Sequence, residues 1–437
     1  MKVDRSFRPK YFYGYVNSVF AGVALFLVGG ANYVLPAMSG FMRNDLGWSA
    51  TATGGAFSVY YVVFGAFVMG AGALVVRFGP RLLIGAGAFV IVVACVLLSI
   101  THQLWQFYLL AGLYAAGMSS GGVVTGPQLA SNWLHKRRGL VIGLLFAVAG
   151  LGGSVLVIAG ERVMGAYGSW RPSWVVMAAI MLIPVILAVA FIRNRPEDLG
   201  QNVDGVEDLA RLAATPEKRS DRAYKCLEGW TVREAAQTPS LWLLVLTFGF
   251  SDYVMLGMLS HQVTYLTKEV GISAGVAAGA LALMVAFMAV GKAAGGWLAD
   301  RVEPRKTLGL MSLMLAAGLL VLLFWHTRFA LYLYVILLGV GFGGSMTQTS
   351  ATLANYYGRK NVAAIMGLVH GSAALLGALS TTMTGVIRDS AGTYVPAFIV
   401  MLVLAVVGAA CAFLARIPQR NAETADAPGA STIMERA

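Results

Sequence analysis

Among the ionisable side chains inside long apolar stretches of this 437-residue sequence, four are candidates for chemistry: Lys292, Asp252, His370 and His261. An ionisable group at the depth of a lipid bilayer is energetically costly, and it is for that reason a candidate functional residue. A lysine there would present a fixed positive charge to an anion, whereas an aspartate or a histidine could take up and release a proton. We therefore expect the chemistry of this chain to centre on these four positions.

The apolar stretches around these residues are long enough to cross a membrane. Hydrophobic residues make up 58% of the chain and charged residues only 12%, whereas a soluble domain carries about 25% charged residues. A helix rises about 1.5 Å per residue, so about 20 apolar residues span the hydrocarbon core. The sequence predicts an all-α polytopic membrane protein with twelve transmembrane helices. We place these helices at residues 14–41, 51–76, 82–101, 104–132, 139–164, 172–192, 239–267, 273–299, 307–326, 329–355, 362–387 and 394–416.

The net charge of +12 is distributed unevenly over this topology. With the N-terminus in the cytoplasm, most lysines and arginines fall on cytoplasmic segments. The opposite side holds Arg43, Arg162, Arg171, Lys268, Arg328 and Arg388. This placement follows the positive-inside rule and indicates contact with anionic lipid rather than with nucleic acid. We predict that both termini are cytoplasmic and that the membrane is a cell membrane of the bacterial inner-membrane type.

The chain also aligns with itself at an offset of 224 residues. At this offset Gly72, Leu74, Arg77, Pro80 and Arg81 meet Gly296, Leu298, Arg301, Pro304 and Arg305. Because each half has an even number of helices, the two halves are parallel repeats with a site between them near the midplane. We divide the chain into a first six-helix half (1–192), a cytoplasmic linker (193–238) with a short helix near 232–237, a second half (239–416) and a disordered tail (417–437).

No cofactor or enzymatic site is indicated. Cys95, Cys226 and Cys411 lack the spacing of a metal site or of a disulfide framework. The sequence has no P-loop for ATP, and the segment between the halves is too short for a catalytic domain. We predict a functional monomer without cofactor, whose partners are lipid and a small molecule.

One segment resembles a signature of the major facilitator superfamily. The stretch Gly296-Trp-Leu-Ala-Asp300-Arg301-Val-Glu-Pro-Arg305-Lys306 is similar to the family's G-x-L-A-D-R-x-G-x-R-K motif between helices 2 and 3, here in the second half. The first-half copy, which contains Arg77 and Arg81, has Val76 where the family has aspartate. The resemblance implies the major facilitator fold and a gating role for Arg77, Arg81, Asp300, Arg301 and Arg305. The alternative is that these charges only set the topology.

Within that superfamily, the chain is similar to the group of monocarboxylate transporters and oxalate:formate antiporters. The likeness rests on Tyr13-Gly14-Tyr15, Leu46-Gly47-Trp48-Ser49, the stretch from Asn132 to Gly143, Thr238-Pro239-Ser-Leu-Trp242 and Tyr357-Gly358-Arg359-Lys360-Asn361. The resemblance implies a secondary carrier of small organic anions.

Lys292 matches the position where the monocarboxylate group carries an arginine that binds the substrate carboxylate. A lysine keeps the charge but loses the two-pronged hydrogen bonding of arginine. The family's acidic partner one turn earlier is replaced by Met288. The alternative is a lysine that extends along its helix toward the cytoplasm without binding substrate.

Three other ionisable residues complete the candidate site. His370 lies at a depth close to that of Lys292. The lysine that the antiporter group carries on this helix corresponds to Ala373 here. With one fixed cation, the site fits a single carboxylate better than a small dicarboxylate. His370 could bind substrate or carry the proton, or it could be an ordinary hydrogen-bonded core residue. Asp252 could carry the proton, pair with Lys292 or only meet cavity water. His261 could act in proton coupling or an outer gate, or lie near the membrane interface.

Polar residues in several helices are weaker candidates. Asn32, Tyr33 and Gln348 could contact substrate, and Gln128 with its polar neighbours could line the cavity. Polar contacts between helices explain such residues equally well.

The hypothesis that follows is a secondary active transporter of a small organic anion, a monocarboxylate, by proton symport with alternating access. The alternatives are an anion exchanger and an exporter of amphiphilic organic compounds. The stretch Gly150-Leu-Gly152-Gly153-Ser154 lacks the proline of the G-x-x-x-G-P signature of drug-efflux relatives, which disfavours the exporter.

Overall fold

The computed structural model describes residues 11–205, 226, 229–324 and 327–419, and within them it is all-helical, with twelve helices long and apolar enough to cross a membrane. The first half contains α1 (Tyr13–Leu46), α2 (Ala50–Phe78), α3 (Pro80–Ser99), α4 (Leu104–Gly121), α5 (Thr125–Trp133), α6 (Arg138–Tyr167) and α7 (Arg171–Ala190). The second contains α10 (Pro239–Lys268), α11 (Ala274–Ala299), α12 (Pro304–Phe324), α13 (Arg328–Tyr357), α14 (Val362–Ala391) and α15 (Val395–Leu414). These helices confirm the predicted fold class.

The fourth predicted span, 104–132, is interrupted. Helix α4 ends at Gly121 and α5 begins at Thr125, with Gly122 outside helical geometry. Two successive glycines weaken a helix, and the Thr125 hydroxyl donates to the carbonyl oxygens of Gly121 and Gly122 at 2.9 and 3.0 Å. The predicted span is present from Leu104 to Trp133, but it is divided into two helices at this point.

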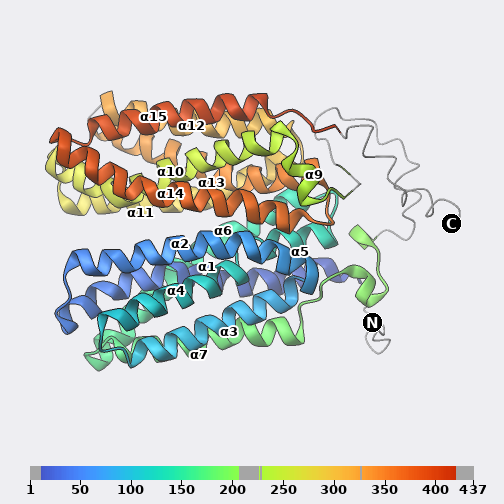
Figure 1. Ribbon diagram of the computed structural model, residues 1–437, viewed down its shortest axis with the longest axis horizontal. Coiled ribbons are helices and arrows are strands. Elements are labelled where there is room, and N and C mark those ends of the chain that lie inside the picture. Colours follow the sequence, from blue (N-terminus) through green and yellow to red (C-terminus); the bar gives the residue numbers. More distant parts are fainter. Residues whose placement is uncertain (1–10, 206–225, 227–228, 325–326, 420–437) are drawn as a thin grey trace, which may run out of the picture.

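Helices α1–α7 form one bundle and α10–α15 a second one beside it (Figure 1). We call the end at which α1, α6 and α10 begin the linker end, because the connection between the halves lies there (Figure 1). Two apolar clusters lie within the first half and one within the second. A fourth cluster joins the two halves and includes Val68 and Val75 of α2 together with Ile365 and Val369 of α14.

The internal repeat is visible in the turns that end four helices. Gly47 and Gly271 follow α1 and α10 with φ of 68° and 78°, and Gly168 and Gly392 end α6 and α14 with φ of 64° and 74°. Each pair is separated by 224 residues, and positive φ values at helix ends favour glycine. The repeat therefore preserves backbone geometry as well as sequence.

The described part of the linker is short. It holds two 3-10 turns, η1 (Pro196–Leu199) and η2 (Val203–Gly205), and α9 (Val232–Ala236). In α9, the Thr231 side chain caps the Glu234 N–H, and this helix lies where the sequence predicts one. The predictions for residues 206–225 and for the tail from residue 420 lie outside the described residues.

Candidate functional site

The two halves meet most closely where glycines of four helices face each other. A Cβ atom on Gly296 of α11 would collide with the Gly139 carbonyl oxygen of α6, and one on Gly143 would collide with the Lys292 carbonyl oxygen. In the same way, a Cβ atom on Gly72 of α2 would collide with the Ala363 carbonyl oxygen of α14. All these approaches lie toward the linker end, so the structure is closed there.

Asp300 joins the halves at one of these contacts. Its two carboxylate oxygens accept hydrogen bonds from the backbone N–H groups of Gly139, at 3.2 Å, and Leu140, at 2.9 Å. These groups belong to the first turn of α6, where the helix dipole favours a negative charge. Beside it, the buried Arg138 side chain donates from Nε to Oδ1 of Asn355 at 2.9 Å and so joins α6 to α13.

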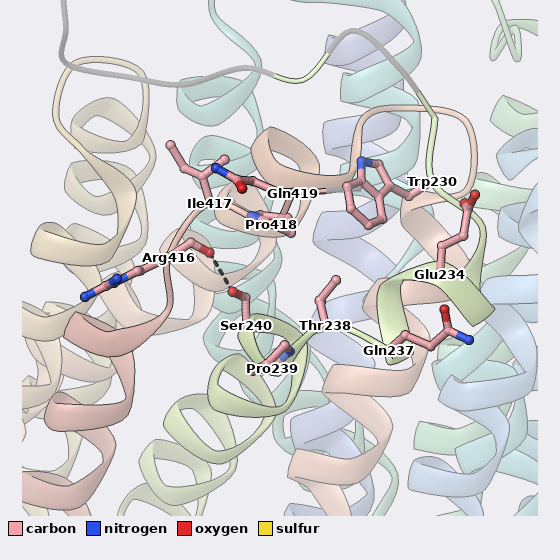
Figure 2. Close-up of a pocket in the computed structure, with 10 residues that line it drawn as sticks. All are labelled: Trp230, Glu234, Gln237, Thr238, Pro239, Ser240, Arg416, Ile417, Pro418 and Gln419. Carbon is pink, nitrogen blue, oxygen red and sulfur yellow. Dashed lines mark hydrogen bonds between the residues drawn. The ribbon is translucent and has the colours of Figure 1, made fainter. Parts of the chain in front are cut away.

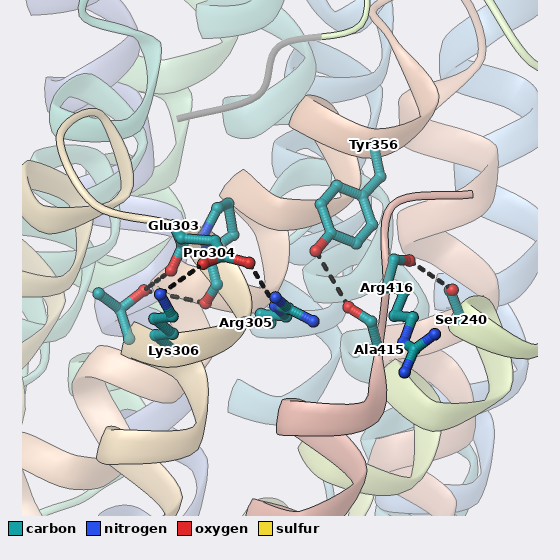
Figure 3. Close-up of polar contacts among 9 residues, drawn as sticks. Ser240, Glu303, Pro304, Arg305, Lys306, Tyr356, Ala415 and Arg416 are labelled. Carbon is teal, nitrogen blue, oxygen red and sulfur yellow. Dashed lines mark hydrogen bonds and ion pairs between the residues drawn. The ribbon is translucent and has the colours of Figure 1, made fainter. Parts of the chain in front are cut away.

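The four arginines of the signature segments contact residues of their own halves. The guanidinium of Arg77 lies 5.2 Å from the centre of the Phe78 ring, and that of Arg301 lies 4.2 Å from the Trp297 ring. Arg81 donates to the Ala188 carbonyl oxygen at 2.9 Å, near the end of α7. Arg305 pairs with Glu303, which Lys306 also contacts at 2.9 Å (Figure 3). The two hydrogen bonds and the ionic attraction from these cations outweigh partial burial and lower the pKa of Glu303.

Lys292 of α11 lies between the two halves and is 7% exposed. It lines a cavity of about 80 Å³ together with Tyr33, Gly150, Leu151 and Ser154 of the first half. The second-half walls of this cavity are Ala282, Val285, Ala286, Met288 and Ala289.

The Lys292 side chain points away from the linker end. Its carbonyl oxygen contacts α6 at Gly143, whereas its Nζ atom lies 3.2 Å from where a Cβ atom on Gly150 would be. Seven residues of helix separate these two glycines, which corresponds to roughly 10 Å along α6. This direction disagrees with a lysine that extends toward the cytoplasm, and it places the charge in the cavity.

Asp252 of α10 belongs to the same half as Lys292 and is half-buried. Its Oδ2 atom lies 3.3 Å from where a Cβ atom on Gly377 would be. The carboxylate interacts electrostatically with Tyr61 of α2, which also interacts with Tyr33. Lys292 and Asp252 are not within ion-pair distance of each other, so the predicted alternative of a direct pair is absent from this conformation.

Asn32 and Tyr33 lie next to each other on α1 and are half-buried. The Tyr60 hydroxyl donates a hydrogen bond to the Asn32 side-chain oxygen. Tyr33 lies against Gly153 of α6, where a Cβ atom would overlap its ring. Tyr33 therefore lines the lysine cavity and also interacts with Tyr61, the tyrosine that interacts with Asp252.

His370, Gln348 and His261 bond to partners within the second half. His370 is buried, with Nε2 2.9 Å from the Ser350 hydroxyl and its ring 4.7 Å from the Phe248 ring. Gln348 Nε2 donates to the Gly295 carbonyl oxygen at 2.8 Å. His261 Nε2 lies 2.9 Å from the Thr381 carbonyl oxygen. None of the three lines the lysine cavity.

The residues that sequence reasoning missed are Tyr61, Ser154 and the cavity-facing glycine Gly150. The pair Tyr60-Tyr61 in an apolar helix was an available signal, because hydroxyl groups in a span need partners. Gln128, for which the sequence left open cavity lining and contact between helices, lies at the linker end, where it lines a different cavity.

Two further cavities open at the linker end, away from Lys292. One, of about 370 Å³, lies beside the start of α10 and is lined by residues that include Trp230, Glu234 and Ser240 (Figure 2). There the Ser240 hydroxyl donates to the Arg416 carbonyl oxygen at 2.6 Å (Figures 2 and 3). The other, of about 550 Å³, lies beside α2 and α5 and includes Arg77, Gln128 and Lys360.

Twelve helices of membrane-spanning length, arranged in two bundles that meet at one end, are typical of a membrane transporter. The chain belongs to the Major Facilitator Superfamily, whose family model matches residues 20–262 and 241–435. It is therefore a secondary transporter and not an enzyme. This result confirms the family to which the signature segments pointed.

Three proteins with similar sequences have names that describe different kinds of transport. The aspyridones efflux protein apdF of Emericella nidulans is 26% identical over 350 residues, 79% of this chain and 62% of that protein. The oxalate:formate antiporter of Oxalobacter formigenes is 23% identical over 352 residues, 78% of this chain and 77% of the other. Monocarboxylate transporter 13 of Bos taurus is 26% identical over 335 residues, 75% and 72% of the two chains. The chain thus spans less than two thirds of the length of the first of these relatives.

A solved structure agrees with the fold. The crystal structure of the superfamily transporter FucP in its outward conformation has a TM-score of 0.70 with this chain. The sequences are 15% identical, and the match covers 92% of this chain and 99% of FucP. The likeness establishes the twelve-helix architecture.

Proposed function

We propose that this chain carries a small monocarboxylate together with a proton. The observation that carries the proposal is Lys292, a buried lysine between the two halves whose ammonium group points into a cavity lined by both. A desolvated cation attracts a carboxylate strongly, because a charge-assisted hydrogen bond gains strength where water is excluded. The single cation there matches a single carboxylate.

Asp252 is the proton site in this proposal. Its carboxylate interacts electrostatically with Tyr61 of the other half, Tyr61 interacts in the same way with Tyr33, and Tyr33 lines the cavity of Lys292. A carboxylate at this depth can bind a proton and release it when its surroundings change, because burial disfavours its charged form. His370 is the weaker candidate, since its ring is hydrogen-bonded and packed inside the second half.

The transport cycle follows from the two closed contacts at the linker end. We propose that residues 1–192 and 239–416 rock as units around the occupied site, and that Asp300 releases α6 when the linker end opens. Arg77, Arg81, Arg301 and Arg305 would hold the local helix ends during this motion. By the placement of basic residues, the linker end is cytoplasmic, both termini are cytoplasmic and the membrane is of the bacterial inner type.

The test is uptake of radiolabelled mono- and dicarboxylates into proteoliposomes, with and without an inward-directed proton gradient. Gradient-driven uptake of a monocarboxylate supports symport. Uptake that ignores the gradient but requires the same compound inside would show exchange.

Asp252→Asn should abolish the stimulation of uptake by the proton gradient, because an amide binds no proton in this pH range. Exchange of internal for external substrate should remain within about threefold of wild type, since the neutral amide mimics the protonated acid. The matched control is Asp389→Asn, an aspartate whose side chain is 76% exposed and pairs with Arg388. Full stimulation of uptake by the proton gradient in the Asp252→Asn variant would show that Asp252 does not carry the proton.

His370→Gln should keep the gradient dependence of uptake. The glutamine amide can keep the hydrogen bond to Ser350, but loss of the ring contact with Phe248 should lower the free energy of unfolding by about 1 kcal/mol. Uptake and thermal unfolding measured on the same preparation separate these effects. Loss of gradient dependence without loss of stability would reassign the proton to His370.

The oxalate:formate antiporter and the efflux protein among the relatives favour two second candidates, an exchanger and an exporter. An exporter of amphiphiles would bind apolar compounds without need of Lys292. Transport of such compounds by the Lys292→Ala variant at the wild-type rate would favour it.

A further inference from the structure

The two contacts between the halves are equivalent under the internal repeat. Gly296 meets Gly139 at the contact of α11 with α6, and Gly72 meets Ala363 at the contact of α2 with α14. Both pairs of positions differ by 224 residues. The backbone N–H groups at the start of α6, which need a hydrogen-bond acceptor, therefore have equivalents at the start of α14.

Different side chains accept hydrogen bonds from these N–H groups in the two contacts. Asp300 accepts hydrogen bonds from the first-turn N–H groups of α6. The position equivalent to Asp300 is Val76, whose side chain has no acceptor. The first turn of α14 thus lacks the carboxylate that the repeat would place beside it.

Gln128 of α5 occupies the place of this missing acceptor. Its side-chain oxygen accepts from the Ala363 N–H at 2.9 Å, and its Nε2 donates to the Arg359 carbonyl oxygen at 3.0 Å. Nε2 also lies 2.7 Å from Oδ1 of Asn132. Gln128 is 4% exposed, so these bonds are shielded from water.

We propose that Gln128 is the latch that holds α14 against the first half in the closed linker end, in place of the carboxylate lost at Val76. The proposal rests on the alternating-access cycle described above, but it concerns the closing of the linker end and not the substrate. One contact is then held by a charge, at Asp300, and the other by a neutral amide. An amide latch does not depend on ionisation, and salt screens it less than a charge.

The test measures opening at the linker end without substrate. Val75 is 1% exposed and lines the linker-end cavity beside α2, so Val75→Cys becomes reactive when the halves separate. The background carries Cys226→Ser, because Cys95 and Cys411 are buried. The readout is the rate of alkylation of the new cysteine by a maleimide in the purified full-length chain.

Gln128→Ala should raise this rate about tenfold, a change that corresponds to about 1.4 kcal/mol. Adding Val76→Asp to the Gln128→Ala variant should return the rate to within about twofold of the parent, because the new carboxylate lies where the repeat places a cap. Ser131→Ala is the matched control, since Ser131 is equally buried on α5 and its hydroxyl has no hydrogen-bond partner. Its rate should not change.

An unchanged rate in Gln128→Ala would overturn the proposal. A raised rate that Val76→Asp fails to reverse would also overturn it, because Gln128 would then act by packing alone. Should Gln128→Ala fail to fold, Gln128→Met keeps the size of the side chain but removes both the acceptor and the donor, and it should raise the rate as Gln128→Ala does; an unchanged rate would contradict the latch. Alkylation is independent of uptake, so failure of the carboxylate proposal would leave these outcomes unaltered.

Discussion

Lys292→Ala should lower kcat/KM for carboxylate uptake about 10- to 100-fold. A hydrogen bond to a charged group contributes about 1.5–3 kcal/mol, and each 1.4 kcal/mol changes a binding constant about tenfold. The buried position of Lys292 between the halves favours the upper part of this range. Initial rates of radiolabelled uptake over a range of substrate concentrations measure it.

Two variants make the Lys292 result specific. Lys292→Arg keeps the charge and should retain more activity than the alanine variant. Lys268→Ala removes an exposed lysine at the end of α10 and should leave uptake unchanged. If Lys292→Ala transported as well as wild type, Lys292 would not be part of the substrate site, and His370 and α1 would become the candidates.

Gly296→Val should reduce uptake about tenfold or more by preventing closure of the linker end. The added side chain would collide with the Gly139 carbonyl oxygen and approach the Gly143 Cα atom, and overpacking of this kind costs about 1–3 kcal/mol. Because the collision exists only when α11 and α6 are in contact, the variant should fold and remain open at this end. Uptake and alkylation of the Val75→Cys probe, measured in the same variant, test both parts.

The chain offers a matched glycine for comparison. Gly70 lies on α2, two residues from the interface glycine Gly72, and a Cβ atom there would meet nothing within 4 Å. Gly70→Val should therefore transport normally, whereas Gly72→Val should behave like Gly296→Val. Normal transport by the Gly296 and Gly72 variants would show that close approach of these helices is not required.

Much of the fold could be predicted because its physical signals are local in the sequence. Apolar length sets each span, and the repeat offset places the glycine turns at Gly47, Gly168, Gly271 and Gly392 in pairs. The break after Gly121 was missed, because glycine pairs are common inside transmembrane helices and only the Thr125 contacts distinguish this one.

The candidate site was harder to predict, because a residue's depth along a helix does not give the direction in which it points. Lys292 and His370 lie at similar depths, yet one points into the cavity between the halves and the other bonds to Ser350 within its own half. The part played by Gln128 depends on a contact with Ala363, 235 residues away in the sequence. Such a contact depends on how the two halves pack against each other, and local sequence patterns do not predict this packing.

The most direct test of proton-coupled carboxylate transport is the internal pH of proteoliposomes loaded with a pH-sensitive dye. On addition of external monocarboxylate at zero membrane potential, we predict rapid acidification of the lumen by wild type. The undissociated acid crosses lipid unaided, so the signal is the excess over vesicles that contain Lys292→Ala. We expect this excess to disappear in Asp252→Asn. Carboxylate uptake by wild type without any excess acidification would contradict proton-coupled transport.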